Sequence, residues 1–86
     1  MFKLEGKKAL ITGASGGIGA TIAKTLHQQG AIVALSGTRR EALEKIAQDL
    51  KERVHVLPCN LKSIEDIESL IPQAESAMEQ VDILVN

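Results

Sequence analysis

The sequence predicts an α/β domain with a parallel sheet, and three observations support this prediction. Short apolar runs alternate with amphipathic segments along the whole chain, as strands and helices do in this class. The apolar runs are continuous rather than broken by polar residues, which is typical of strands covered on both faces. A glycine-rich stretch over residues 12–19 joins the first apolar run directly to the first helical pattern.

The first strand is expected over residues 7–12, and the turn that ends it reads Thr12-Gly-Ala-Ser-Gly-Gly-Ile-Gly19. A strand that feeds a helix through such a turn aims the unpaired N–H groups of the helix at the turn, and the helix dipole adds to their attraction for an anion. Glycines tolerate positive φ, and their missing Cβ lets a pyrophosphate contact the backbone. The spacing differs from the standard G-x-G-x-x-G signature and lacks the Gly-Lys-Ser/Thr ending of a mononucleotide loop. A turn that binds nothing is the alternative.

Two strand–helix units follow from the next periodic segments. The first helix is expected to end at Gly30, in the C′ position. A second strand is expected over residues 31–36, and Thr38 and Glu41 then have capping-box spacing, which predicts Thr38 as the N-cap of a second helix. The apolar face of the first helix is predicted as Ile18, Ile22, Ala23 and Leu26, and that of the second as Leu43, Ile46, Ala47 and Leu50.

The last unit begins with a short third strand over residues 54–57. Ser63 and Asp66 form another capping-box pair ahead of a third helix. Pro72 removes one backbone donor and is expected to kink or restart that helix. A fourth strand follows over residues 81–85. The inward face of the third helix is predicted as Ile64, Ile67, Leu70 and Ile71.

This alternation predicts the N-terminal part of a Rossmann-type doubly wound parallel sheet with strand order 3-2-1-4. Because the fourth strand lies on the far side of the first, the ligand crevice is expected at the carboxyl ends of strands one and four, beside the glycine-rich turn. Eighty-six residues make at most one small domain. Residues 1–86 are therefore expected to be the dinucleotide-binding part of a single domain that stops after strand four.

Composition argues against several other classes of function. A net charge of −1 and a single aromatic residue, Phe2, argue against nucleic-acid binding. No apolar run approaches the roughly 20 residues of a membrane span, and no secretory signal is recognised, so a cytoplasmic location without membrane association is expected. The single cysteine, Cys59, fits a reducing compartment. His27 and His55 are expected to be structural, and no residue spacing suggests a metal site.

The stretch after the second strand bears on the choice of cofactor. An NAD-binding sheet is expected to carry an acidic residue there for the ribose 2′-hydroxyl, but none occurs between Ala31 and Arg40. Thr38, Arg39 and Arg40 stand there instead, and a guanidinium suits a 2′-phosphate. This predicts NADP, with Arg39 as the phosphate ligand. In the alternative, both arginines are solvated residues that balance Glu41 and Glu44, and Thr38 is only a cap.

Two further strand ends face the same crevice. Asn60 and Leu61 follow the third strand, where an amide and an apolar side chain suit an adenine ring. Asn86 ends the fourth strand, near the expected nicotinamide-side ribose. Each of the three is equally consistent with an ordinary residue of a strand-ending turn.

The chain resembles the short-chain dehydrogenase/reductase family along its whole length. The residues that carry the resemblance are Gly6-Lys7, the turn from Thr12 to Gly19, Asn60 and Asp82-Ile-Leu-Val-Asn86. Within the family, the chain is most similar to the bacterial 3-oxoacyl-[acyl-carrier-protein] reductases of fatty-acid synthesis, in the stretches Ser36-Gly37-Thr38-Arg39, Asn60-Leu61 and Val81-Asp-Ile-Leu-Val-Asn86.

The resemblance implies an oxidoreductase that uses NADPH to reduce an acyl-carrier-protein thioester, as a homotetramer when complete. It implies that the turn wraps the pyrophosphate, that Thr38 and Arg39 hold the 2′-phosphate, that Asn60 and Leu61 contact the adenine end, and that Asn86 contacts the ribose. The residues it assigns to the turn are Gly13, Ala14, Ser15, Gly16, Gly17, Ile18 and Gly19.

The chain departs from the family in lacking its chemistry. Family members use a Tyr to donate the proton, a Lys four residues later and a Ser, and this chain contains no tyrosine. A ketone that accepts a hydride needs a proton source within reach. The 86 residues are therefore expected to bind cofactor at best and to be inactive alone. Two alternatives stay open, a short-chain reductase for another carbonyl or alcohol substrate and a non-catalytic dinucleotide-binding module.

Overall fold

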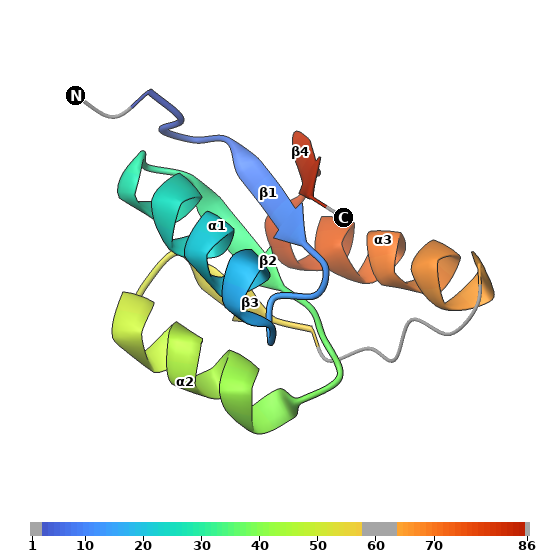
Figure 1. Cartoon of the computed structure of the whole chain (residues 1–86). Coiled ribbons are helices and arrows are strands. Elements are labelled where there is room, and N and C mark those ends of the chain that lie inside the picture. Colours follow the sequence, from blue (N-terminus) through green and yellow to red (C-terminus); the bar gives the residue numbers. More distant parts are fainter. Residues whose placement is uncertain (1–2, 58–63, 86) are drawn as a thin grey trace.

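The computed structural model describes residues 3–57 and 64–85. Cys59, Asn60, Leu61, Ser63 and Asn86 lie outside these residues, so the expectations placed on them are not addressed by the structure. The elements alternate as β1 (Lys8–Ile11), α1 (Gly17–Gln28), β2 (Ile32–Leu35), α2 (Arg40–Leu50), β3 (Val54–Val56), α3 (Ile64–Met78) and β4 (Ile83–Val85), as Figure 1 shows.

The four strands form one parallel sheet in the order β3-β2-β1-β4, which confirms the predicted topology. β1 lies inside the sheet, where Leu10 pairs with Ala34 of β2 on one side and with Leu84 of β4 on the other. The three apolar residues of β1 are completely buried. This burial on both faces explains why the strand reads as an unbroken apolar run.

The helices cover the two faces of the sheet (Figure 1). Ala9 and Ile11 of β1 share one core cluster with Ala23 of α1 and Leu43 of α2. Leu10 points the other way and shares a second cluster that includes residues of α3. Successive side chains of a strand alternate between faces, so this division places α1 and α2 on one face and α3 on the other.

The predicted inward face of α1 is wrong at Ile18, whose side chain is 82% exposed. Ala23 and His27 are the buried residues of α1, and Ala20 and Leu26 pack on the same core. At 3.6 residues per turn, Ile18 lies about 140° around the helix from Ala23. The helix therefore approaches the sheet through small side chains and leaves this isoleucine in solvent beside the turn.

Two other local expectations are corrected. The N-cap of α2 is Arg39 rather than Thr38, and it makes no capping hydrogen bond through its side chain. Of the two outcomes expected at Pro72, the restart is wrong, because α3 runs as one helix through this residue. Pro72 removes the N–H that would bond to the carbonyl of Glu68, and both residues are exposed. Water can therefore satisfy that carbonyl, and the helix tolerates the proline.

Hydrogen bonds join the end of α1 to the start of β3. Gly30 adopts a φ of 96°, which confirms the predicted glycine at C′. The Nε2 of His27 lies 2.7 Å from the carbonyl of Glu52, so this nitrogen carries the proton and donates it. Arg53 donates to the carbonyls of His27 and Ala31, at 3.2 and 2.8 Å. His27 thus has the structural role expected for it.

Candidate functional site

The glycine-rich turn is held by the ends of both strands that flank β1. The backbone N–H of Thr12 donates to the carbonyl of Val85 at 2.9 Å, and its hydroxyl donates to the same oxygen at 3.1 Å. On the other side, Ala14 N–H donates to the carbonyl of Ser36 at 2.8 Å. The carboxyl ends of β4, β1 and β2 therefore meet at this turn, where a doubly wound sheet places its ligand crevice.

Two glycines allow the turn to lie directly under the helix. Gly13 has a φ of 65°, a conformation that favours glycine. A Cβ on Gly19 would stand 2.4 Å from the carbonyl oxygen of Gly13, so only a glycine lets α1 approach the turn this closely. The helix consequently begins immediately above the end of β1.

The first turn of α1 offers donors to solvent. The N-cap is Gly16, which has no side chain, and the helix begins at Gly17. The N–H groups of the first helical residues have no acceptor within a helix. Gly16, Gly17 and Ile18 are all exposed. This end of α1 therefore has the donors, dipole and access that an anion requires.

The segment after β2 packs closely against the turn. Ser36 and Gly37 are buried, whereas Thr38 and Arg39 are exposed. A Cβ on Gly37 would stand 2.6 Å from the Ser15 hydroxyl oxygen. The Ser36 hydroxyl is completely buried and has no hydrogen-bond partner within the described part of the chain. Residue-type reasoning missed Gly37 as a site residue, although its position directly after an apolar strand is a signal for close backbone contact.

The two arginines have different surroundings. Arg39 donates from Nη2 to the carbonyl oxygen of Ser15 at 2.6 Å, so its guanidinium lies against the glycine-rich turn. Arg40 pairs with Glu44 one helical turn away at 3.0 Å. The charge-balancing alternative therefore describes Arg40. Arg39 is the cation that the structure brings to the turn.

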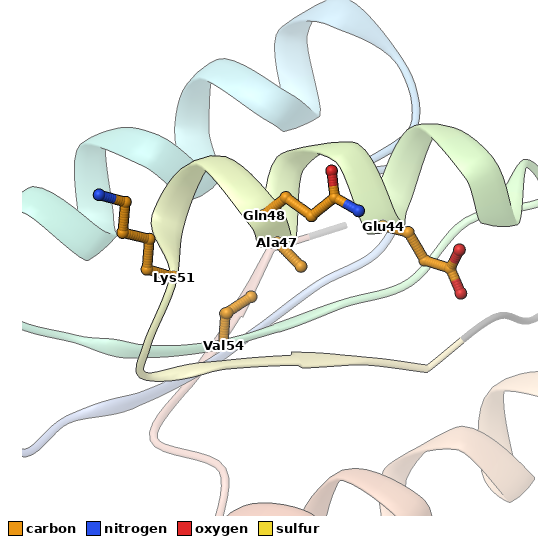
Figure 2. Close-up of a pocket in the computed structure, with 5 residues that line it drawn as sticks. All are labelled: Glu44, Ala47, Gln48, Lys51 and Val54. Carbon is orange, nitrogen blue, oxygen red and sulfur yellow. The ribbon is translucent and has the colours of Figure 1, made fainter.

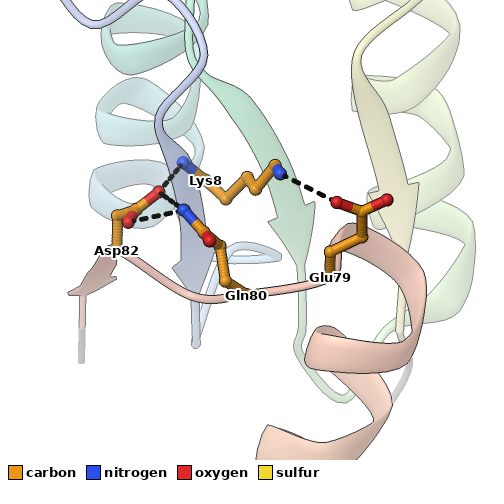
Figure 3. Close-up of polar contacts among 4 residues, drawn as sticks. All are labelled: Lys8, Glu79, Gln80 and Asp82. Carbon is orange, nitrogen blue, oxygen red and sulfur yellow. Dashed lines mark hydrogen bonds and ion pairs between the residues drawn. The ribbon is translucent and has the colours of Figure 1, made fainter.

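At the opposite edge of the sheet from the turn, polar contacts join the start of β1 to the start of β4 (Figure 3). The carboxylate of Asp82 accepts the backbone N–H of Lys8 at 2.9 Å and the side-chain amide of Gln80 at 3.0 and 3.1 Å. These bonds, first that of Gln80 and then that of Lys8, hold the pKa of Asp82 below its usual value of 3.8. The side-chain Nζ of Lys8 also forms an ion pair with Oε2 of Glu79 at 3.8 Å. Sequence reasoning missed the bond between Asp82 and Lys8 because these residues are 74 positions apart in the chain.

Two surface hollows lie away from the turn. The larger one, about 630 Å³, lies on one face of α2 beside the start of β3 and is lined by Glu44, Ala47, Gln48, Lys51 and Val54 (Figure 2). A smaller one, about 260 Å³, adjoins the end of α1 and is lined by Glu5, Gly30, Glu52 and Arg53. Among the described residues, no group of three or more His, Cys, Asp or Glu could hold a metal ion. No helix in that part of the chain is long and apolar enough to cross a membrane.

The fold and the turn define a class, a Rossmann-type α/β domain whose glycine-rich turn opens the first crossover helix. The model of the short chain dehydrogenase family matches residues 7–86. The chain belongs to the short chain dehydrogenase family.

Two relatives with known names are similar to this chain. Nodulation protein G of Rhizobium sp. strain N33 is 56% identical over 86 residues, which are all of this chain and 35% of that protein. The 3-oxoacyl-[acyl-carrier-protein] reductase of Rickettsia bellii is 45% identical over 85 residues, 99% of this chain and 34% of that protein. The chain thus spans about a third of the length of the curated relatives it matches.

Solved structures agree with the topology. A hydroxysteroid dehydrogenase from Escherichia coli superposes with a TM-score of 0.91 at 34% identity, over 99% of this chain and 37% of that one. A 3-ketoacyl-(acyl-carrier-protein) reductase from Brucella melitensis, complexed with NADH, gives a TM-score of 0.88 at 32% identity, over 95% of this chain and 34% of that one.

Proposed function

We propose that the protein is an NADP-dependent reductase of 3-oxoacyl-[acyl-carrier-protein] thioesters, in which this chain is the cofactor-binding part. The observation that carries the cofactor assignment is the guanidinium of Arg39, which lies against the glycine-rich turn in a segment without any carboxylate. The substrate assignment is supported by the 45% identical Rickettsia bellii reductase. Fatty-acid synthesis in the cytoplasm and a homotetrameric assembly belong to the same proposal.

The proposed binding roles rest on the positions of the described residues and, for Asn60, Leu61 and Asn86, on the resemblance to the family. The N–H groups at the start of α1 receive the pyrophosphate, and the glycines from Gly13 to Gly19 let it contact the backbone. Arg39, with Thr38 beside it, holds the 2′-phosphate through charge-assisted hydrogen bonds. Ile18, exposed next to the turn, provides an apolar surface for the bound cofactor. Asn60 and Leu61 are proposed for the adenine end and Asn86 for the ribose.

The chemistry divides between this chain and the remainder of the enzyme. Bound NADPH supplies a hydride to the substrate ketone. The residues of this chain hold and orient the cofactor, whereas the chain has no tyrosine to donate a proton. Since the match covers about a third of each relative, the proposal places the proton-donating group and the thioester-binding surface in the remaining part.

Cofactor preference tests the role of Arg39 in the intact protein. Arg39→Ala removes the charge-assisted bonds to the 2′-phosphate, worth about 1.5–3 kcal/mol, so the preference for NADPH over NADH should fall about tenfold to a hundredfold. Arg40→Ala is the matched control, because Arg40 pairs with Glu44 instead of contacting the turn. Binding is measured by titration of each variant with both cofactors. Equal losses of NADPH and NADH affinity would refute the phosphate role.

Substrate preference tests the second half of the proposal. The rate of NADPH oxidation by the intact protein is compared between a 3-oxoacyl thioester of the carrier protein and a ketosteroid. The proposal expects a clear preference for the thioester. A preference for the steroid would favour the alternative suggested by the similarity to the hydroxysteroid dehydrogenase. Cofactor binding without reduction of either substrate would favour a non-catalytic dinucleotide-binding module.

A further inference from the structure

Three contacts join the glycine-rich turn to the segment that follows β2. Ala14 N–H donates to the Ser36 carbonyl at 2.8 Å. Gly37 packs so closely that any Cβ there would meet the Ser15 hydroxyl. At the exposed edge, the Arg39 guanidinium donates to the Ser15 carbonyl at 2.6 Å. The first contact joins two buried residues and the second joins buried Gly37 to half-buried Ser15. The third depends on one exposed side chain that reaches from one segment to the other.

The turn needs such support before a ligand arrives. It is rich in glycines, whose backbones lose the most conformational freedom when they become ordered. A binding loop that is disordered when free must be ordered at the expense of ligand affinity, whereas a preorganised loop binds more tightly. The Arg39–Ser15 bond is short and has a charged donor, which makes it stronger than a neutral hydrogen bond.

We propose that Arg39 is a positioning residue for the glycine-rich turn as well as a phosphate ligand. By holding the Ser15 carbonyl, it keeps the turn between Gly13 and Gly19 in its binding conformation when no cofactor is present. The consequence for binding rests on the proposed function, because it requires that the turn bind a dinucleotide. The effect extends to NADH, which has no 2′-phosphate and therefore gains nothing from the charge of Arg39 at that position.

The guanidinium has enough donors for both roles. It carries five N–H groups in a fixed plane, and the Ser15 carbonyl occupies one of them. The remaining donors are held in a defined orientation by the bond already made. A phosphate at the neighbouring position would then meet an arginine whose side-chain entropy has been partly lost beforehand.

Hydrogen exchange in the intact, ligand-free protein tests the positioning role. The peptide that contains residues 13–19 is followed by mass spectrometry in Arg39→Ala, Arg39→Lys and Arg40→Ala. Arg39→Ala should raise the exchange of this peptide, while the control Arg40→Ala should leave it unchanged. Arg39→Lys should restore part of the protection, because an ammonium on a long side chain can also donate to the Ser15 carbonyl. Because Arg39 is exposed, its replacement should leave the protein folded, with an unfolding temperature close to that of the parent.

NADH affinity is measured on the same variants. The loss of one hydrogen bond that preorganises the turn should weaken NADH about threefold to tenfold in Arg39→Ala relative to Arg40→Ala. Equal exchange at residues 13–19 in the two variants would overturn the inference, and so would an unchanged NADH affinity. If exchange rises but the parent protein binds neither cofactor, the positioning of the turn stands and the proposed function fails.

Discussion

Two glycines in the same helical turn of α1 should respond oppositely to alanine. A Cβ on Gly19 would lie 2.4 Å from the Gly13 oxygen, 2.9 Å from the Gly13 carbonyl carbon and 3.0 Å from the Ala14 Cα. All three are backbone atoms, so the clash is relieved only if the helix or the turn moves. Gly17 has nothing within 4 Å of its Cβ position.

The two magnitudes follow from this geometry. Overpacking of a close contact costs about 1–3 kcal/mol, and we expect Gly19→Ala to destabilise the protein within this range even though alanine is the better helix former. Gly17→Ala has no clash and gains part of the roughly 1 kcal/mol by which alanine exceeds glycine in helix propensity. The free energy of unfolding should therefore fall in one variant and stay equal or rise in the other.

Denaturant unfolding of the two intact, ligand-free variants against the parent measures this difference. Both variants must be free of ligand, because a Cβ on Gly17 would project into the open space where the cofactor is proposed to bind. Equal stability of Gly19→Ala and Gly17→Ala would refute the argument that close approach of helix and turn requires Gly19.

Other parts of the structure lead to three further predictions. Because the pKa of Asp82 is lowered in the folded protein, its contribution to stability is complete above pH 3.8 and is lost as the pH falls through the folded-state pKa. Asp82→Asn should remove this part of the acid dependence of stability, as measured by unfolding below pH 5. An unchanged acid dependence would contradict this prediction. Arg53→Ala removes the donor of the Ala31 carbonyl, whereas the His27 carbonyl keeps the N–H of Gly30, and should cost about 1–3 kcal/mol in thermal unfolding. Parent-like stability would refute the role of Arg53 in joining α1 to β3. The 86 residues alone should associate through β4, where Leu84 is 52% exposed; Leu84→Lys should reduce association in size-exclusion chromatography, and a monomeric, cooperatively melting parent fragment would contradict this prediction.

The sheet was predictable because its signals are local. The apolar runs at β1 and β2 mark strands buried on both faces, and glycine at C′ ends α1 as expected. The strand order follows from the handedness and crossover rules for parallel units. Element boundaries shift by one or two residues, because strand pairing ends where the partner strand does: β1 spans Lys8–Ile11 rather than residues 7–12.

The site was predictable in its parts but not in their contacts. The turn and Arg39 are recognisable from residue types, whereas the bond between Arg39 and Ser15 joins positions 24 residues apart. Ile18 was placed on the apolar face of the first helix because its spacing from Ile22 is helical, and only the packing of Ala23 shows which face turns inward. Thr38 had an appropriate capping spacing, but the helix begins one residue later than that spacing requires.

The pairing of β1 with β4 sets the order in which the crevice can be completed. The Asp82 carboxylate bonds to the Lys8 amide across 74 positions, and the Thr12 hydroxyl bonds to the Val85 carbonyl across 73. Contacts so distant in sequence close large loops, and the entropic cost of closing them slows their formation. During synthesis, β1, β2 and β3 are all made before β4. One wall of the crevice is therefore assembled only when β4 docks, and ligand binding at the turn reports that β4 has joined β1, β2 and β3.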